Sequence, residues 1–192
     1  MTAFTEIKGI LSRLQIPEKE QDDLLTISKI KKLRKDEFFI SEGQVPKKFG
    51  IIINGLFRYY YLNEKGDEFT KGLILTGNVL AAYSAMLHQQ KSLFFIQALE
   101  DSIILEINYH PWLTLQQQNP FWDKFLIALL QKGYCVKEKR ERELLLLDAE
   151  TRYRIFREEF PTLEKRIKLQ IIASYLGIKP ESLSRIRKNT SN

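Results

Sequence analysis

The segment from Leu169 to Lys188 restricts the possible folds of this chain more than any other segment. It reads LQIIASYLGIKPESLSRIRK, with apolar residues at helical spacing on both sides of Gly177 and the small Ala173 where two crossing helices would approach closest. Gly177 can adopt the positive φ of a tight turn, and Pro180 fits the first turn of a helix, where its missing N–H group would have no partner. The pattern predicts a helix-turn-helix whose shared core consists of Ile172, Leu176, Ile178, Leu183 and Ile186.

Positive charge is concentrated in the same part of the chain. The chain has 30 Lys and Arg residues against 24 Asp and Glu residues, and residues 151–192 hold ten of the basic residues but four of the acidic ones. Residues 1–150 are therefore neutral, while residues 151–192 carry a net charge of +6. A basic segment favours an anionic polymer as partner, because each neutralised phosphate releases counterions. We interpret this segment as a binder of double-stranded DNA.

The second helix of the motif presents side chains that suit DNA. Glu181 can accept a hydrogen bond from cytosine N4, and Arg185 can donate to guanine O6 and N7, so these two are expected to read sequence. The remaining polar and basic residues are expected to contact phosphates, which position a protein without specifying a sequence. The predicted DNA-binding residues are Lys179, Glu181, Ser182, Ser184, Arg185, Arg187 and Lys188.

From about Leu33 to Ile107 the sequence is typical of strands rather than helices. Short runs rich in β-branched and aromatic residues alternate with turn signals, and the clearest predicted hairpins are at Asn54-Gly55 and at residues 63–67. Two short helices are expected before them, over residues 4–14 and 22–27. Many short strands at even spacing predict an α+β chain with an N-terminal antiparallel β-roll of the jelly-roll type.

A long helix is expected next, from Phe121 to about Leu147, because this run contains no proline and one glycine. Residues 125–130 are all apolar, so this part of the helix needs covering on every side, and a twin helix from a second subunit is the simplest cover. The predicted dimer interface is Phe125, Leu126, Leu129, Leu130, Gly133 and Val136. The chain then divides into a roll with its N-terminal helices (1–118), a dimerisation helix (119–147) and a helix-turn-helix domain (151–192).

Several classes of protein are not expected. No apolar run approaches the roughly 20 residues that span a bilayer, and the N-terminus lacks the apolar core of a signal peptide, so we expect a cytoplasmic protein without membrane contact. The single cysteine, Cys135, excludes an internal disulfide and a four-thiolate site, and its apolar surroundings predict a buried thiol. The chain has no phosphate-binding Gly-Lys-Ser/Thr loop, no His-x-x-x-His pair and no nucleophile elbow, so neither an enzyme nor a metal site is expected.

In this order of parts the chain resembles the Crp/Fnr family of bacterial transcription regulators. The resemblance rests on the strand GLFRYYY at 55–61, the corner GNVL at 77–80, the turn ALED at 98–101 and the motif ASYLGI at 173–178 followed by LSRI at 183–186. It implies a roll like the cyclic nucleotide-binding domain and a C-terminal domain of the winged-helix type. It also implies a homodimer that reads a palindrome with two recognition helices about 34–36 Å apart. RNA polymerase is a candidate partner of such a regulator.

The chain departs from the family pattern in the roll and at its end. Family members that bind cyclic nucleotide hold the ribose with a Gly-Glu pair and the phosphate with an Arg-Ser or Arg-Ala pair, but the matching positions here are Ala81-Ala82 and Ser92-Leu93. Burying a phosphate without a cation is costly, so cyclic AMP is not expected, and the roll binds another effector or none. If a pocket exists, its predicted lining is Leu80, Ala81, Ala82, Tyr83, Ser84, Ser92 and Leu93.

Other sensing chemistries of the family also fit poorly. Iron–sulfur sensing requires several cysteines, and His88 and His110 are interpreted as loop residues rather than haem ligands. The sequence ends at Asn192 without the strand that forms a C-terminal wing in other members, so we expect a domain lacking that strand. The chain is thus predicted to be a sequence-specific transcription regulator. The alternative is a small-molecule or protein-binding module of the cyclic-nucleotide-domain type without sequence-specific DNA binding.

Overall fold

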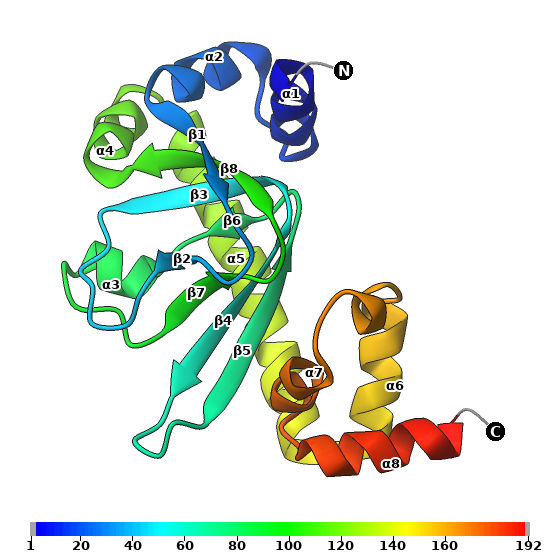
Figure 1. Cartoon of the computed structure of the whole chain (residues 1–192). Helices are drawn as coiled ribbons and strands as arrows, with labels where there is room; N and C mark the ends of the chain where they lie inside the picture. Colours follow the sequence, from blue (N-terminus) through cyan, green and yellow to red (C-terminus); the bar gives the residue numbers. More distant parts are fainter. Residues whose placement is uncertain (1–2, 191–192) are drawn as a thin grey trace. The chain divides into compact units, whose positions relative to one another are not determined.

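The computed structural model describes residues 3–190, which form two compact units (Figure 1). The first unit holds the chain up to residue 61 together with residues 72–127, and the second holds residues 62–71 and the chain from residue 128 onward. No helix within the described range 3–190 combines the length and the apolar character that crossing a membrane requires.

The first unit is a β-roll with flanking helices. Its helices are α1 (Ala3–Arg13), α2 (Glu18–Thr26), α3 (Tyr83–Leu87), α4 (Tyr109–Gln118) and the start of α5 (Phe121–Leu146). Its strands are β1 (Ser28–Leu33), β2 (Phe38–Ile40), β3 (Lys48–Asn54), β4 (Leu56–Leu62), β5 (Glu68–Leu75), β6 (Val79–Leu80), β7 (Phe95–Ala98) and β8 (Ser102–Asn108), with the ends of β4 and β5 extending into the second unit.

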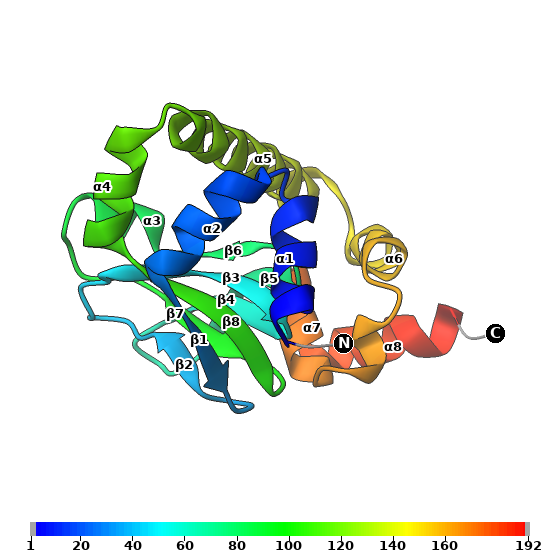
Figure 2. The ribbon, with the colours of Figure 1, turned by 90° about the horizontal axis from the view of Figure 1, so that it is seen from above.

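The strands form two four-stranded antiparallel sheets, in the orders β1-β8-β3-β6 and β2-β7-β4-β5. Side chains that alternate along the strands fill the space between the sheets, with Phe57 and Ile96 from one sheet and Ile52 and Ile104 from the other, all fully buried. Helices α1, α2 and α4 pack on the first sheet, and Figure 2 shows them on the same side of it. The predicted antiparallel roll is confirmed.

Several predicted elements match the structure closely, and others were missed. The helix over 4–14 is confirmed as α1, whose Ile7, Ile10 and Leu11 are buried at helical spacing. The second helix starts earlier than expected, at Glu18. Strand β1, the short β6 and helices α3 and α4 were not predicted. Helix α4 begins Tyr-His-Pro, and a proline is tolerated in the first turn of a helix.

The predicted hairpin at Asn54-Gly55 is wrong. Strand β3 pairs with β8 and β6, whereas β4 pairs with β7, so residues 54–55 carry the chain from one sheet to the other. The predicted hairpin at residues 63–67 connects β4 to β5, which are neighbours in one sheet. There the Asn63 side chain accepts from the backbone N–H groups of Lys65 and Asp67 at 3.0 and 2.8 Å.

A buried carboxylate ties three strands of the first sheet together. Glu106 on β8 is 3% exposed, and its oxygens lie 3.0 Å from Lys29 Nζ on β1 and 2.8 Å from Lys48 Nζ on β3. Lys31 Nζ is 3.7 Å away. Burial raises the pKa of Glu106, but the ammonium groups of Lys48 and Lys29 outweigh this effect and lower the pKa below its ordinary value.

Replacing this carboxylate should weaken the fold in a pH-dependent way. Glu106→Gln is expected to lower the free energy of unfolding by about 2 kcal/mol at pH 7, because the amide leaves the lysines without a counter-charge but these lysines are partly solvated. A carboxylate with a lowered pKa stabilises the fold above its unfolded-state pKa of about 4.3, and this stabilisation is lost as the pH falls through the folded-state pKa. Urea unfolding at pH 7 and at pH 3 measures the difference, which should shrink at pH 3. Glu42→Gln at an exposed position is the control, and an acid dependence equal to the parent's would contradict the prediction.

The second unit is helical apart from the hairpin end. It contains residues 62–71, most of α5, α6 (Ala149–Glu159), a short 3-10 helix η1 (Leu163–Lys165), α7 (Leu169–Leu176) and α8 (Pro180–Thr190). The predicted joint after α5 coincides with the start of α6, where the Asp148 side chain caps the helix by accepting from Thr151 N–H at 2.8 Å. Within residues 3–190, the elements after α5 are all helical.

Candidate nucleic-acid interface

Helices α7 and α8 form the helix-turn-helix that the sequence predicts. Ile172, Ala173 and Leu176 of α7 and Leu183 of α8 are at most 1% exposed, so the two helices share a closed core. Helix α8 begins at Pro180, as expected from the missing N–H group of proline. Ile178 and Ile186, which were also assigned to this core, are half-buried at its edge.

Gly177 makes the turn between the two helices. Its φ of +66° lies in the left-handed region, and the N–H groups of Gly177 and Ile178 donate to the carbonyl oxygens of Ser174 and Ala173 at 3.2 and 3.0 Å. A Cβ atom at Gly177 would lie 3.1 Å from Leu144 Cδ2 of α5. The turn therefore requires glycine for its backbone conformation.

One face of α8 carries exposed polar side chains that lie close together. With 3.6 residues per turn, Glu181, Ser184, Arg185 and Lys188 fall within about 100° of the helix circumference. All four are exposed. We call these four residues the α8 stripe. The stripe combines one carboxylate, one hydroxyl and two cations on a helix whose opposite side is buried.

The other predicted DNA-binding residues lie off this stripe. Arg187 is exposed, but its Nε lies 3.6 Å from Glu164 of η1 in the same unit. Ser182 is half-buried, and Lys179 is exposed in the turn before α8. Glu164 also accepts a hydrogen bond from the Tyr153 hydroxyl, and burial together with this carboxylate raises the pKa of Tyr153 to about 12. The sequence alone gave no sign that Glu164 would engage Arg187.

Helix α5 supplies the residues predicted for a dimer interface. Phe125 is 9% exposed and packs against Phe121 and Trp122 of its own chain, with ring centroids 6.1 and 5.8 Å apart. Leu126 and Leu129 are half-buried, whereas Leu130, Gly133 and Val136 are exposed. A second exposed apolar set follows the spacing 3 and 4, namely Ile127, Leu130 and Tyr134, which are 53%, 43% and 67% exposed.

Cys135 is exposed on α5, so the prediction of a buried thiol is wrong. The apolar residues around it in sequence are themselves exposed, because they lie on a part of the helix that its own chain leaves uncovered. Within residues 3–190, no three His, Cys, Asp or Glu side chains gather in a way that could hold a metal ion.

The residues predicted to line an effector pocket in the roll differ widely in exposure. Leu80 and Ala82 belong to the core between the sheets, while Leu93 is 72% exposed and Ser84 is exposed. The Ala81 N–H group donates to the Tyr59 hydroxyl at 3.0 Å, and burial raises the pKa of Tyr59. Tyr83 is half-buried.

A cyclic nucleotide would find poor partners at the matching positions. Ser92 is 1% exposed, its hydroxyl donates to Phe94 O at 2.8 Å, and its N–H donates to Gln44 O at 2.8 Å. Ala81, Ala82 and Leu93 offer neither a carboxylate for a ribose nor a cation for a phosphate.

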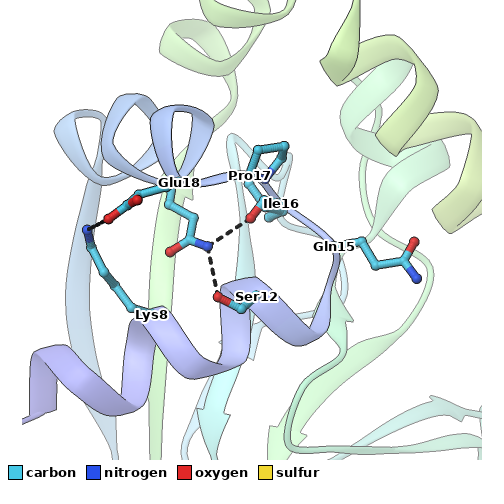
Figure 3. Close-up of a pocket in the computed structure, with 7 residues that line it drawn as sticks. Lys8, Ser12, Gln15, Ile16, Pro17 and Glu18 are labelled. Carbon is cyan, nitrogen blue, oxygen red and sulfur yellow. Dashed lines mark hydrogen bonds and ion pairs between the residues drawn. The ribbon is translucent and has the colours of Figure 1, made fainter.

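A surface pocket lies between α1 and α2, where no site was predicted (Figure 3). Its polar groups are engaged with one another: Gln21 Nε2 donates to Ser12 Oγ at 3.0 Å and to Ile16 O at 2.8 Å. Lys8 Nζ is 3.9 Å from Glu18 and 3.0 Å from Asp22. The polar side chains of this pocket therefore stabilise the packing of α1 against α2 and do not converge on a ligand site.

Comparisons with known proteins agree with this architecture. Residues 30–119 match the model of the cyclic nucleotide-binding domain. The fumarate and nitrate reduction regulatory protein of Yersinia pestis is 28% identical over 194 residues, covering 92% of this chain and 76% of that protein. The electron transport regulator A of Shewanella oneidensis is 27% identical over 180 residues, covering 86% of this chain and 69% of that protein.

Solved structures share the fold. The c-di-GMP-responsive global regulator CLP of Xanthomonas campestris superimposes with a TM-score of 0.75 at 16% identity, over 88% of this chain and 89% of that chain. The roll, the long helix and the helix-turn-helix thus occur in one order in this chain and in known regulators. The chain is thus similar in sequence to bacterial regulatory proteins, and it shares its fold with solved transcription regulators of the Crp/Fnr family.

Proposed function

We propose that this chain is a sequence-specific DNA-binding transcription regulator that acts as a homodimer on a palindromic site. The observation that carries the proposal is the α8 stripe, which stands exposed on a helix-turn-helix with a closed core. A recognition helix in the major groove needs such a face, with its buried side held by the first helix. The regulators that resemble this chain support the same role.

Within the stripe, we assign different tasks to different side chains. Arg185 donates to guanine O6 and N7, and Glu181 accepts from cytosine N4. Lys188 and Ser184, with Lys179 in the turn, contact phosphates. The sequence-based set also included Ser182 and Arg187, and these contribute less in our proposal because Ser182 is half-buried and Arg187 lies beside Glu164.

Dimerisation through α5 follows from its uncovered apolar residues. Ile127, Leu130 and Tyr134 recur at the spacing of a coiled-coil seam, so a twin helix would remove them from water. Phe125, by contrast, is already used inside its own chain. RNA polymerase is a candidate partner, and the bacterial cytoplasm is where such a regulator would meet its DNA.

We propose that the protein regulates without a cyclic nucleotide and without catalysing a reaction. The poor fit at Ala81, Ala82, Ser92 and Leu93 supports the first part, and the regulators to which the chain is similar support the second. The roll then serves either another effector or none. A thermal-shift screen tests this point: stabilisation by cyclic AMP would contradict the proposal.

Selection of genomic DNA fragments by the purified protein tests the function directly. At near-physiological salt and without effector, sequencing of the retained fragments should reveal a shared palindrome. Retention of fragments without a shared sequence would reject sequence-specific binding by the free protein. A failure to retain DNA even at low salt would favour the alternative, a binding module whose terminal helices serve assembly only.

The division of labour within the stripe predicts two different mutant phenotypes. Arg185→Ala should reduce discrimination between the specific site and random DNA by about 1–3 kcal/mol. Lys188→Ala should weaken binding to both DNAs alike and make the slope of log K against log salt less steep by about one. Fluorescence anisotropy over a range of salt concentrations measures both effects. Equal losses on both DNAs in both variants would show that the two residues do not differ in role.

A further inference from the structure

The first helix of the helix-turn-helix is bonded to the β4–β5 hairpin. Thr70 N–H donates to Ser174 Oγ at 2.8 Å, and Ser174 Oγ donates to Glu68 O at 2.8 Å. One hydroxyl thus bridges two backbone groups of the hairpin end that belongs to the second unit. Thr70 is 5% exposed, so its side of the contact is shielded from water, whereas Glu68 is exposed.

The next residue on α7 is held by α5. The guanidinium of Arg140 stacks on the ring of Tyr175, with Cζ 3.5 Å from the ring centroid, and the same group donates to Tyr175 O. Tyr175 is 7% exposed, and burial lowers the pKa of Arg140 and raises that of Tyr175. Leu144, one turn further along α5, comes close to Gly177.

These contacts meet α7 at adjacent residues from two different segments. We call Ser174 and Tyr175, with their partners Glu68, Thr70 and Arg140, the α7 clamp. The chain between α5 and α6 is two residues long, which limits the reach of the helix-turn-helix domain but does not fix its direction. Two contacts from separate segments define that direction, while the α8 stripe takes no part in them.

We infer that Ser174 and Arg140 are positioning residues that hold the helix-turn-helix in an orientation competent for DNA without a bound effector. The inference rests on the proposed DNA binding and extends it to the regulation of the same site. It also agrees with a roll whose residues do not fit the family's usual ligand. A clamp built from the chain's own side chains supplies the ordering that a ligand would otherwise supply.

Population arithmetic gives the expected effect. If the clamp keeps nearly all molecules in the competent orientation, a variant that is competent for about one tenth of the time binds its site about tenfold more weakly. The loss of one partly buried hydrogen bond or one stacked cation is of the right size to cause this change. Binding through nonspecific phosphate contacts should change much less.

The first test measures orientation without DNA. In a Cys135→Ala background, spin labels are placed by Glu138→Cys on α5 and Asn189→Cys on α8, and labelled chains are diluted with unlabelled chains. The parent should give one narrow distance distribution, and both Ser174→Ala and Arg140→Met should broaden it. Ser174→Thr, which keeps the hydroxyl, should restore the narrow distribution. Narrow distributions in both disrupting variants would overturn the inference whether or not the protein binds DNA.

The second test measures affinity for the palindrome selected above. Ser174→Ala and Arg140→Met should each bind about tenfold more weakly, with little change on random DNA. Arg142→Met is the matched control, because it removes the same charge from an exposed position two residues further along α5. Tighter binding by the disrupting variants would overturn the inference, since the clamp would then hold an incompetent orientation. An equal loss in the Arg142 control would also overturn it, because total charge would explain the result.

Discussion

Replacing Leu130 and Tyr134 together with glutamate is expected to convert the protein to a monomer and to lower its affinity for its palindrome by more than about 100-fold. Both side chains are exposed on α5, although side chains of this size and apolarity gain free energy from burial. They lie four residues apart, on one side of the helix, where a parallel twin would meet them. Two carboxylates per helix would then face two others across the seam.

The large effect on DNA binding arises from the linkage of two half-sites. When one subunit is bound, the second meets its half-site at a high effective concentration, so losing the dimer removes the gain without changing any contact to DNA. Light scattering coupled to size exclusion should give the mass of one chain for the variant and of two for the parent. Anisotropy should show the loss on the palindrome but little change on an isolated half-site.

A matched variant separates the seam from the charge. Ala128→Glu with Cys135→Glu adds the same two carboxylates to exposed positions that lie about 130° around α5 from the proposed seam. This variant should remain a dimer and keep its affinity. If both double variants dimerise normally, the subunits do not meet through this face of α5.

Local rules predicted the parts of the molecule that depend on neighbours in sequence. The turn at Gly177 and the helix start at Pro180 are both decided within a few residues, and the structure has both of them. The α8 stripe could be predicted from the sequence for the same reason, because helical periodicity alone places Glu181 and Arg185 on one side of the helix. The sequence could not distinguish Arg187 from the residues of the α8 stripe, because its partner Glu164 lies 23 residues away.

The features that the sequence did not predict all depend on residues that lie far away in the sequence. Strand β1 reads SKIKKL, a pattern too charged to suggest a strand, and it is held by pairing with β8 and by Glu106. Cys135 lies among apolar residues in sequence, yet its exposure depends on which side of α5 the rest of the chain covers. Ser174 and its hairpin partners are about a hundred residues apart in the sequence, so no local pattern could predict their contact.

At Asn54-Gly55 the sequence correctly predicted a turn that needs glycine, but it predicted a hairpin where the chain crosses between the two sheets. Substitution of this glycine is expected to cause the largest loss of stability. Gly55→Ala should lower the free energy of unfolding by about 3–5 kcal/mol. The φ of Gly55 is +136°, which side chains rarely allow, and a Cβ atom would lie 2.1 Å from Ser102 Oγ and 3.1 Å from Ser102 Cα. Ser102 has little freedom to move, since it is 3% exposed and donates to Glu100 O at 2.7 Å.

A double-mutant cycle separates the two causes of this loss. Ser102→Gly removes the side-chain atoms that the new methyl group would strike but leaves the backbone strain, so Gly55→Ala in that background should cost about half as much. Gly72→Ala on β5 is the control, because its φ is not positive and a Cβ atom there would lie 3.7 Å from Ile74 Cδ1. Urea unfolding of the four variants measures each step. If the chain crosses between the sheets over Ser102, Gly55→Ala must be far more destabilising than Gly72→Ala. A type I′ hairpin at Asn54-Gly55 would not place Ser102 against Gly55. In that case Gly55→Ala would lose only the conformational preference of glycine, about 1 kcal/mol.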